Sequence, residues 1–287
     1  MERIAEYAAL PSEEAQKSAS RLASGGAALI SPPPGWPSAG AITFRGLRVA
    51  YRPSTPFVLH GVDLAIRGGE RLGVVGRTGS GKSSLIAALW RTPDVQEGII
   101  EIDGVDIAAL SLRDLRRALS IIPQEPVLLA GSVRSNLDVA GGEFSDEQLW
   151  AALEAVALRG AVEGLPGGLL AEVRDGGAPL SLGQRQLLTV ARALLRRRRI
   201  VVLDEASSSV DVETDVLLQA AVRRELQGAT VLTIAHRINT IGDSDRVVVL
   251  ADGKVAECGA PAELAREGGS AFAALLREGQ REQRESA

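Results

Sequence analysis

The strongest constraint on the fold is an eight-residue stretch that fits the pattern G-x-x-x-x-G-K-[S/T]. It follows the apolar run 71–75, which predicts a buried strand, and its last two residues open the run 82–90, which favours a helix. The glycines allow successive backbone N–H groups to point at phosphate oxygens, and the helix start adds partial positive charge at the same place. The sequence therefore predicts a phosphate-binding loop, called the P-loop below, which runs Gly76-Arg77-Thr78-Gly79-Ser80-Gly81-Lys82-Ser83.

Two side chains of the P-loop have predicted roles. Lys82 is expected to reach the β- and γ-phosphates of a nucleotide, and the Ser83 hydroxyl is expected to hold Mg²⁺. The alternative is an ordinary glycine-rich turn between a strand and a helix, and the Lys-Ser ending argues against it. A P-loop alone fits a GTPase, a kinase or a motor protein, so other residues have to separate these classes.

Two carboxylates follow a second apolar run. Residues 200–203 predict a strand buried on both faces, and Asp204 and Glu205 come directly after it. Because ligands of open α/β sheets bind at the carboxyl ends of the strands, both side chains are expected beside the P-loop. Asp204 can bind Mg²⁺ directly or through water, and Glu205 can orient and deprotonate a water molecule. An exposed acidic turn is the alternative.

Strand and helix patterns alternate through the middle of the chain, which predicts an α/β fold with a largely parallel sheet. A capping box of Ser145 and Gln148 opens the helical pattern 145–158. Asp252-Gly253 predicts a hairpin turn. Further strands are expected at 41–47, 120–123, 230–234 and 246–250.

The two ends of the chain differ from its middle. Residues 1–38 include a proline-rich stretch at 31–37, which stops any helix and predicts a lead-in and linker. Residues 276–287 are charged and predict a frayed tail. We therefore expect one domain over residues 39–275.

Composition and charge exclude several protein classes. Aromatic residues are only 3 % while hydrophobic residues are 45 %, so the core is expected to be aliphatic. The net charge of −4 predicts no nucleic-acid partner. The sequence has no apolar run long enough for a membrane span and no signal peptide, so we expect a soluble chain. The single cysteine, Cys258, excludes an internal disulfide framework and suits a reducing compartment.

A third motif carries a family resemblance. Leu180-Ser181-Leu182-Gly183-Gln184 resembles the LSGGQ signature of ATP-binding-cassette (ABC) proteins, and Arg185-Gln186 and residues 191–194 continue it as in that family. The order and spacing of the motifs also match, and the resemblance covers roughly residues 40–275. It implies a P-loop NTPase (RecA-like) core with a mainly parallel sheet, an antiparallel β subdomain, and a helical signature subdomain at about 128–190.

The resemblance also implies roles for single residues. Tyr51 matches the aromatic residue that stacks on adenine, and Gln124 matches the glutamine that senses Mg²⁺ and links to membrane domains. His236 resembles the switch histidine that contacts the γ-phosphate and, with Glu205, forms the expected catalytic pair. The expected Mg²⁺ ligands are Ser83, Gln124 and Asp204. The residues expected to bind ATP on this chain are Tyr51, Gly76, Arg77, Thr78, Gly79, Ser80, Gly81, Lys82, Ser83, Ser84 and Gln124. The signature residues expected to act on a partner's ATP are Ser181, Leu182, Gly183 and Gln184. The expected D-loop residues are Ser208 and Asp211.

Several of these residues also have simpler interpretations. Ser181 would be an N-cap without the family context, Tyr51 an exposed strand residue, and His236 a hydrogen-bonded core residue. His60 has no assigned role. The basic run 196–199 lies near a predicted helix end, where cations are favourable, and so favours a solvated helix terminus over a nuclear signal.

The motifs most resemble the second cassette of C-subfamily (multidrug-resistance-associated) transporters. That resemblance includes the departure from LSGGQ at Leu182, where the general family has glycine. The resemblance implies that two cassettes pair head to tail, and the departure at Leu182 predicts that this pair is asymmetric, with a second, non-identical cassette. The site on this chain's P-loop would hydrolyse ATP, and the site completed by the loop of Leu182 would turn over poorly.

The expected function is therefore an ATPase that powers export of organic anions or conjugates at the cytosolic face of a membrane, with transmembrane domains as partners. The lead-in resembles a segment that normally follows a membrane helix, so we expect a fragment of a longer polypeptide. Two alternatives stay open. One is an ATP-dependent gating module of a channel, and the other is a soluble ABC ATPase without a transport function.

Overall fold

The computed structural model describes residues 12–14, 29–93, 95–204, 212–235, 241–267 and 269–285. Its centre is a six-stranded sheet with the strand order β12-β11-β3-β10-β9-β6. The five strands from β11 to β6 are parallel, and only β12 runs antiparallel to its neighbour. This arrangement confirms the predicted α/β fold with a mainly parallel sheet. The strands are β3 (Arg71–Val75), β6 (Leu119–Ile122), β9 (Ile200–Asp204), β10 (Thr230–Ile234), β11 (Arg246–Ala251) and β12 (Lys254–Gly259).

A second sheet, with the order β2-β1-β4-β5, is antiparallel throughout. Its strands are β1 (Ile42–Ala50), β2 (Leu59–Ile66), β4 (Val95–Ile102) and β5 (Val105–Asp106). One face of this sheet is buried, and Phe44 and Ile100 share a hydrophobic cluster with β3 and with helix α3 (Lys82–Leu89). The second sheet therefore packs on the element that follows the P-loop.

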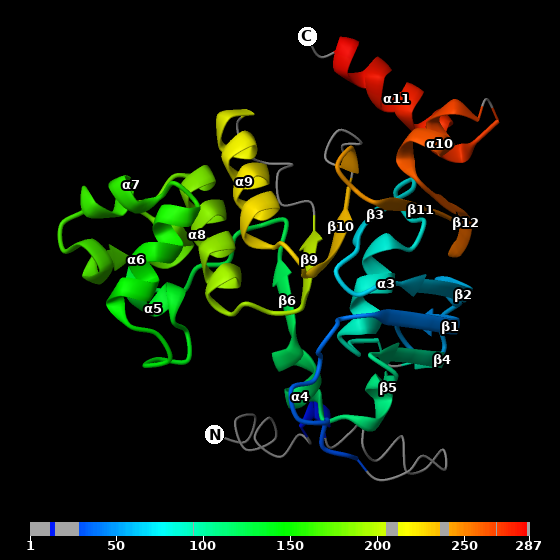
Figure 1. Cartoon of the computed structure of the whole chain (residues 1–287), viewed down its shortest axis with the longest axis horizontal. Helices are drawn as coiled ribbons and strands as arrows, with labels where there is room; N and C mark the ends of the chain where they lie inside the picture. Colours follow the sequence, from blue (N-terminus) through cyan, green and yellow to red (C-terminus); the bar gives the residue numbers. More distant parts are fainter. Residues whose placement is uncertain are drawn as a thin grey trace.

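The helices divide into groups around the central sheet (Figure 1). Helices α5 to α8 lie together on one side, whereas α3 lies with the antiparallel strands on the other. The helices beyond α3 are α4 (Leu112–Ala118), α5 (Val133–Leu137), α6 (Asp146–Ala155), α7 (Arg159–Glu163), α8 (Leu182–Leu195), α9 (Val212–Glu225), α10 (Pro261–Arg266) and α11 (Ala271–Glu285). Short elements are η1 (Ile107–Ala109), η2 (Gly168–Leu170), η3 (Asp175–Gly177), β7 (Gly131–Ser132) and β8 (Glu172–Val173). None of the helices in the described ranges is long and apolar enough to cross a membrane.

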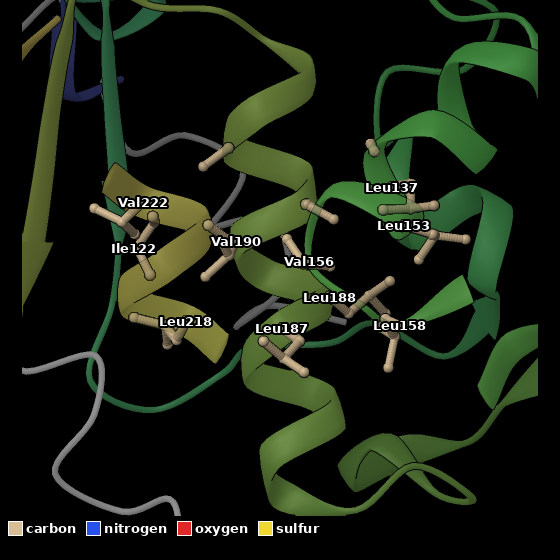
Figure 2. Packing of buried hydrophobic residues seen from close by; sticks show 14 of the residues in the cluster. Ile122, Leu137, Leu153, Val156, Leu158, Leu187, Leu188, Val190, Leu218 and Val222 are labelled. Carbon is tan, nitrogen blue, oxygen red and sulfur yellow. The ribbon is translucent and has the colours of Figure 1, made fainter. Parts of the chain in front are cut away.

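Helix α8 is the centre of the hydrophobic cluster that joins the helical group to the sheet (Figure 2). Its Leu188 faces Leu153 of α6, and its Val190 lies beside Ile122 of β6 and Val222 of α9. The predicted aliphatic core is confirmed, since Phe44 and Phe272 are the only aromatic residues among the buried hydrophobic side chains of the described ranges. Because this core is closely packed, a displacement of α8 would also shift the side chains of the helical group and of the sheet that pack against it.

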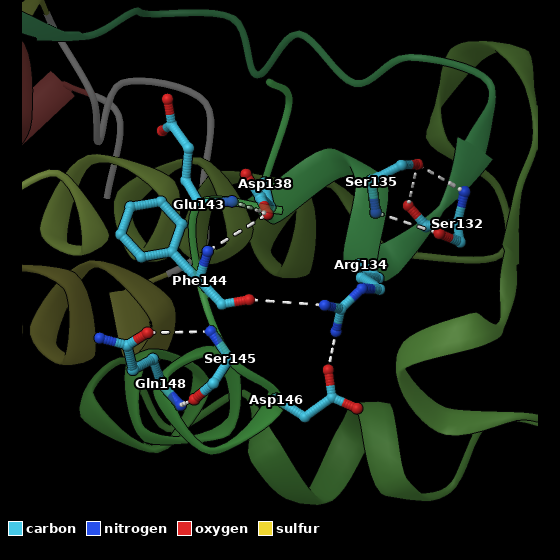
Figure 3. Close-up of polar contacts among 9 residues, drawn as sticks. All are labelled: Ser132, Arg134, Ser135, Asp138, Glu143, Phe144, Ser145, Asp146 and Gln148. Carbon is cyan, nitrogen blue, oxygen red and sulfur yellow. Dashed lines mark hydrogen bonds and ion pairs between the residues drawn. The ribbon is translucent and has the colours of Figure 1, made fainter. Parts of the chain in front are cut away.

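Helix α6 begins where its capping residues predict, but it ends earlier than predicted. Ser145 caps the helix, with the reciprocal Gln148 bond that completes the predicted capping box (Figure 3). The helix ends at Ala155, before the predicted 158, because Ala157 adopts a left-handed conformation with φ 57°. The Leu158 N–H then donates to the Leu153 carbonyl at 2.8 Å, a Schellman termination that usually has glycine at the left-handed position.

The loop before α6 is held by polar contacts of its own (Figure 3). Arg134 of α5 pairs with Asp146 and donates to the Phe144 carbonyl. The Asp138 carboxylate accepts the backbone N–H of Glu143 at 3.0 Å. These bonds connect the end of α5 to the start of α6, so the two helices pack on α8 as one unit.

The end of the predicted linker lies against the antiparallel sheet, whereas Glu13 and Glu14, further upstream, contact α4. The Trp36 indole N–H donates to the Ile102 carbonyl at 2.9 Å. The Asp103 carboxylate accepts four backbone N–H groups, from residues 38, 39, 40 and 41, at 2.7, 3.0, 3.1 and 2.8 Å. Burial alone would raise the pKa of Asp103, but the four N–H donors outweigh it and lower the pKa. A carboxylate thus anchors the chain where β1 begins.

Candidate functional site

The P-loop joins β3 to α3, as the sequence predicts. Gly81 is the N-cap of α3, with φ 104°, and has no side chain with which to cap the helix. The first backbone N–H groups of a helix have no partner within the helix, and the helix dipole adds positive charge there. The start of α3 is therefore suited to binding an anion.

Lys82 lies at the centre of the loop. Its side chain is only 4 % exposed, and its Nζ donates to the carbonyls of Gly76 at 2.8 Å and Arg77 at 3.2 Å. Burial lowers the pKa of Lys82, and the negative charge of Asp204 acts against this shift. Asp204 ends β9, which is separated from β3 only by β10, so the parallel sheet brings both carboxyl ends to one edge. The structure thus brings together Lys82 and Asp204, which are far apart in sequence.

The loop fits closely against the strands behind it. A Cβ on Gly76 would lie 2.3 Å from the Leu250 carbonyl oxygen and 2.6 Å from Ser80 Oγ, so only glycine fits there. Ser80 is buried, and its Oγ has no hydrogen-bond partner among the described residues. Arg77, Thr78 and Gly79 are exposed at the tip of the loop. The loop therefore has one packed side and one side open to a ligand.

The residues expected to bind adenine and Mg²⁺ lie around this open side of the P-loop. The Tyr51 hydroxyl is 3.1 Å from the Oγ of buried Ser84, in the first turns of α3, while 46 % of Tyr51 is exposed. Tyr51 follows the end of β1, so it is a loop residue beside α3 and not an exposed strand residue. Ser83 is exposed on the first turn of α3. An aromatic ring, a hydroxyl and a carboxylate are thus placed around one helix start.

The oxygen donors present fit Mg²⁺. No group of three or more His, Cys, Asp or Glu side chains lies together in the described ranges. Mg²⁺ in nucleotide sites commonly takes only one or two protein ligands and completes its shell with water and phosphate oxygens. The Ser83 hydroxyl and the Asp204 carboxylate are ligands of this kind.

Gln124 follows the edge strand β6 and is exposed. The structure adds a neighbour that the sequence did not identify. Gln186 of α8 is 1 % exposed, and its Nε2 donates to the carbonyl of Pro123 at 3.1 Å. The residue before Gln124 is therefore tied to the helix that follows the signature motif. This bond spans 63 positions of sequence, and no local pattern indicates it.

The signature motif forms the start of α8. Ser181 is the N-cap, and its Oγ accepts the Gln184 N–H at 3.2 Å while Gln184 Oε1 accepts the Ser181 N–H at 2.9 Å. The N-cap interpretation of Ser181 is confirmed. Leu182 is 38 % exposed, whereas Gly183 is buried, and a Cβ there would lie 2.8 Å from the Thr214 hydroxyl of α9.

The structure does not bring the signature motif and the P-loop together. Helix α8 belongs to the cluster of the helical group, and α3 belongs to the cluster under the antiparallel sheet. Figure 1 shows the two helices on different sides of the central sheet. Four predicted residues, Glu205, Ser208, Asp211 and His236, lie outside the described residues, and their roles stay predictions.

Comparisons with known proteins agree on one family. The model of the family described as "ABC transporter" matches residues 59–208. "ATP-binding cassette sub-family C member 2" is 52 % identical over 241 residues in Rattus norvegicus and 49 % identical over 264 residues in Homo sapiens, covering 84 % and 92 % of this chain. "Multidrug resistance protein mrp-7" of Caenorhabditis elegans is 45 % identical over 276 residues, or 96 % of this chain. The chain spans only 16–17 % of the length of these curated relatives.

A solved structure gives the same result for the fold. "Structure of a bacterial Atm1-family ABC exporter with ATP bound" aligns with a TM-score of 0.80 and 32 % identity, and the match covers 90 % of this chain and 45 % of that one. The similarity confirms the expected P-loop NTPase core with its antiparallel and helical parts.

Proposed function

Because the chain belongs to the ABC transporter family, we propose that it is a cassette that binds Mg-ATP and hydrolyses it to drive transport. The observation that carries the proposal is the P-loop itself. It has a buried lysine, an uncapped helix start and the Asp204 carboxylate beside them. A buried ammonium group beside an open helix N-terminus is suited to a polyphosphate, which is the ligand that satisfies both.

Each residue of the site has a proposed task. Lys82 and the loop N–H groups hold the phosphates, and Tyr51 stacks on the adenine. Mg²⁺ supplies charge neutralisation between the phosphates when bound, and Ser83, Gln124 and Asp204 are its proposed ligands. Most of the catalysis is electrostatic positioning of the phosphates by this chain's donors.

The residues proposed to accept the proton of the attacking water and to contact the γ-phosphate lie outside the described ranges. Glu205, next to Asp204, orients water and accepts its proton, and His236, next to buried Ala235, contacts the γ-phosphate. Glu205 directly follows β9, and His236 follows β10 with only Ala235 between them; both strands end at the same edge of the sheet as β3. This adjacency supports the assignment, because that edge is where the P-loop lies.

The second ATP site requires a partner. We propose a head-to-tail pair with a non-identical cassette, in which Ser181, Leu182, Gly183 and Gln184 close over the partner's ATP. Ser208 and Asp211 act as the D-loop between the two sites. The exposed start of α8, on the other side of the sheet from α3, supports pairing in trans, because the motif cannot reach the P-loop of its own chain. Leu182 makes this second site the weaker one.

The whole assembly is proposed from the relatives. These relatives include an ABC exporter and a multidrug resistance protein. We propose that this cassette works at the cytosolic face of a membrane with transmembrane domains, in the same longer chain or a separate one, and powers export of organic anions or conjugates. Residues 39–275 are the cassette, about 128–190 its helical subdomain, 1–38 the lead-in and 276–287 the tail.

A Glu205→Gln variant tests the hydrolytic part of the proposal. Loss of a general base typically costs about 10²–10⁴-fold in rate, so phosphate release should fall by at least about a hundredfold while ATP binding persists. The ATP-bound pair should accumulate, as measured by size-exclusion chromatography. Glu263→Gln on α10, which neutralises an exposed carboxylate, is the matched control. Wild-type turnover in Glu205→Gln would remove Glu205 as the base, and absence of ATP binding by the wild-type chain would reject the function.

A further inference from the structure

We propose that the turn of the β11–β12 hairpin, Asp252-Gly253, is a positioning element of the P-loop, and that Gly253 is a positioning residue for nucleotide binding. The inference rests on the proposed function, because it concerns the same phosphate site. It adds a segment more than 160 residues away from the loop, at positions 252–253, which the motifs do not include. Three observations carry it: a chain of hydrogen bonds, a close approach of backbones, and a second turn whose glycine is exposed and meets no other element of the described ranges.

The hydrogen bonds connect three elements. The Gly253 N–H donates to the Ser80 carbonyl at 3.2 Å. The Gly253 carbonyl in turn accepts the His60 N–H of β2 at 2.9 Å. The turn therefore bridges the P-loop to the antiparallel sheet through both polar groups of one peptide residue.

This bond acts on a group that faces the ligand. The carbonyl of Ser80 and the N–H of Gly81 belong to one planar peptide unit, and in a trans peptide they point in opposite directions. The two cis peptides of the described ranges lie elsewhere, at Pro37 and Pro179. Holding the Ser80 carbonyl against the hairpin therefore fixes the direction of the Gly81 N–H, which precedes Lys82 at the helix start. A fixed N–H direction is what preorganised phosphate binding requires.

The backbones also touch. Gly253 is buried, and a Cβ there would lie 2.3 Å from the Val58 carbonyl oxygen and 2.8 Å from Cδ2 of His60. A Cβ on Gly81 would lie 3.6 Å from the Cα of Gly253 and 2.6 Å from Cδ2 of Leu59. The turn thus lies between the P-loop and the start of β2, and a side chain at Gly253 would clash with Val58 and His60 and so displace the turn that holds the Ser80 carbonyl.

The chain contains a natural control for turn chemistry. Asp103-Gly104 joins β4 to β5 with the same dipeptide and nearly the same backbone, φ 49° and 77° against 48° and 71° at Asp252-Gly253. Gly104 is exposed, and a Cβ there would meet nothing within 4 Å. The left-handed conformation alone therefore does not demand burial. What distinguishes Gly253 is its position between Val58 and His60 on one side and the P-loop carbonyl of Ser80, to which it donates, on the other.

The experiment compares Gly253→Ala with Gly104→Ala. Both substitutions impose the same left-handed strain on alanine, so their difference reports the surroundings of Gly253, which are the hydrogen bond to Ser80 and the close approach of Val58 and His60. The first readout is the Kd for Mg-ATP and for inorganic triphosphate. The second is amide hydrogen exchange of residues 76–85 without nucleotide, which needs no ligand. Gly253→Ala should weaken both ligands roughly tenfold, equivalent to one lost hydrogen bond with its geometry, and Gly104→Ala should stay within about twofold of wild type.

A second pair of variants covers a failure of Gly253→Ala to fold. Two glycines inserted between Asp252 and Gly253 break the bond to Ser80 without adding a Cβ, and the same insertion between Asp103 and Gly104 is its control. Faster exchange in the P-loop and equal loss of ATP and triphosphate binding, only in the 252–253 variants, support the inference. Equal Kd values and equal exchange rates in both members of each pair would overturn the inference. A loss of affinity for ATP but not for triphosphate would also overturn it, because the hairpin would then act on adenine binding and not on phosphate binding. If the wild-type chain bound neither ligand, the proposed function would fail, and the exchange comparison would still decide the role of the hairpin.

Discussion

Two helices of this chain begin at motifs that are assigned to phosphate, and they begin differently. Helix α3 starts after Gly81, with no side-chain cap, and its first residue is buried Lys82. Helix α8 starts after Ser181, whose side chain and that of Gln184 cap each other's backbone N–H groups. Both ends carry the positive end of a helix dipole. Of these two helices, only α3 begins without a side-chain cap.

The difference shows that two helix starts with similar motifs can be physically unequal. At α3 a phosphate gains a buried cation and uncapped donors at once, so this chain can form that site by itself. At α8 one donor is already satisfied, and an exposed leucine lies where the general signature has glycine. A phosphate approaching α8 must therefore compete with a cap and pass a side chain. The comparison predicts a strong site on α3 and a weak contribution from α8.

Removing the cation of α3 should give the largest effect. Lys82→Ala deletes the buried ammonium group that would contact the phosphates, and loss of one such electrostatic contact typically costs about 10²–10³-fold in rate. Mg-ATP hydrolysis and Mg-ATP affinity should both fall, as measured by phosphate release and calorimetry. Lys82→Arg keeps the charge but not the compact shape, so it should also be impaired.

The control for this variant is Arg266→Ala, which removes an exposed cation from the last turn of α10. It should behave as wild type. If Lys82→Ala hydrolysed ATP as fast as Arg266→Ala, the buried lysine would have no catalytic contact, and the contrast between α3 and α8 would lose its main support.

Removing the Leu182 side chain at the start of α8 should give the next largest effect, and here the rate of ATP hydrolysis should rise. Leu182→Gly removes the side chain that keeps a phosphate away from the helix start, so turnover at the partner's site should rise, by up to roughly tenfold for a gain of about 1.4 kcal/mol. Leu182→Ala should be intermediate. Both are best measured in a paired complex whose α3 site carries Lys82→Ala, because the remaining turnover then comes from the partner's P-loop. An unchanged or lower rate with intact folding would contradict the steric argument.

Patterns within a short stretch of sequence predicted much of this fold. The continuous apolar runs 200–203 and 230–234 became the buried parallel strands β9 and β10, and Asp252-Gly253 became the β11–β12 turn. Strands β2 and β4 were not predicted. Each contains an internal glycine, Gly61 or Gly98, that interrupts a simple strand pattern. The end of α6 was also missed, because alanine occupies a left-handed position that usually signals itself by glycine.

The parts of the site that the sequence could not predict are the long-range contacts. The motif predicted Lys82, but not that Nζ would bind the Gly76 and Arg77 carbonyls. Likewise, Gln186 meets Pro123 across 63 positions, and Gly253 meets Ser80 through backbone atoms that any residue carries. A pattern in one stretch of sequence does not indicate which distant residue that stretch contacts. These long-range contacts can be predicted only when the strand order of the sheet is known.

The smallest expected effect comes from the cap of α8, and it separates the two functions of Ser181. Ser181→Ala removes the N-cap acceptor and should lower the free energy of unfolding by about 1 kcal/mol. Ser145→Ala removes the same kind of capping box from α6, which packs on α8 in the same hydrophobic cluster, and should cost a similar amount. If Ser181 also contacts the partner's phosphate, only Ser181→Ala will slow the partner's site at equal stability. Equal slowing by both variants would mean that Ser181 acts through helix stability alone, and its hydroxyl would then contribute no donor to the shared site.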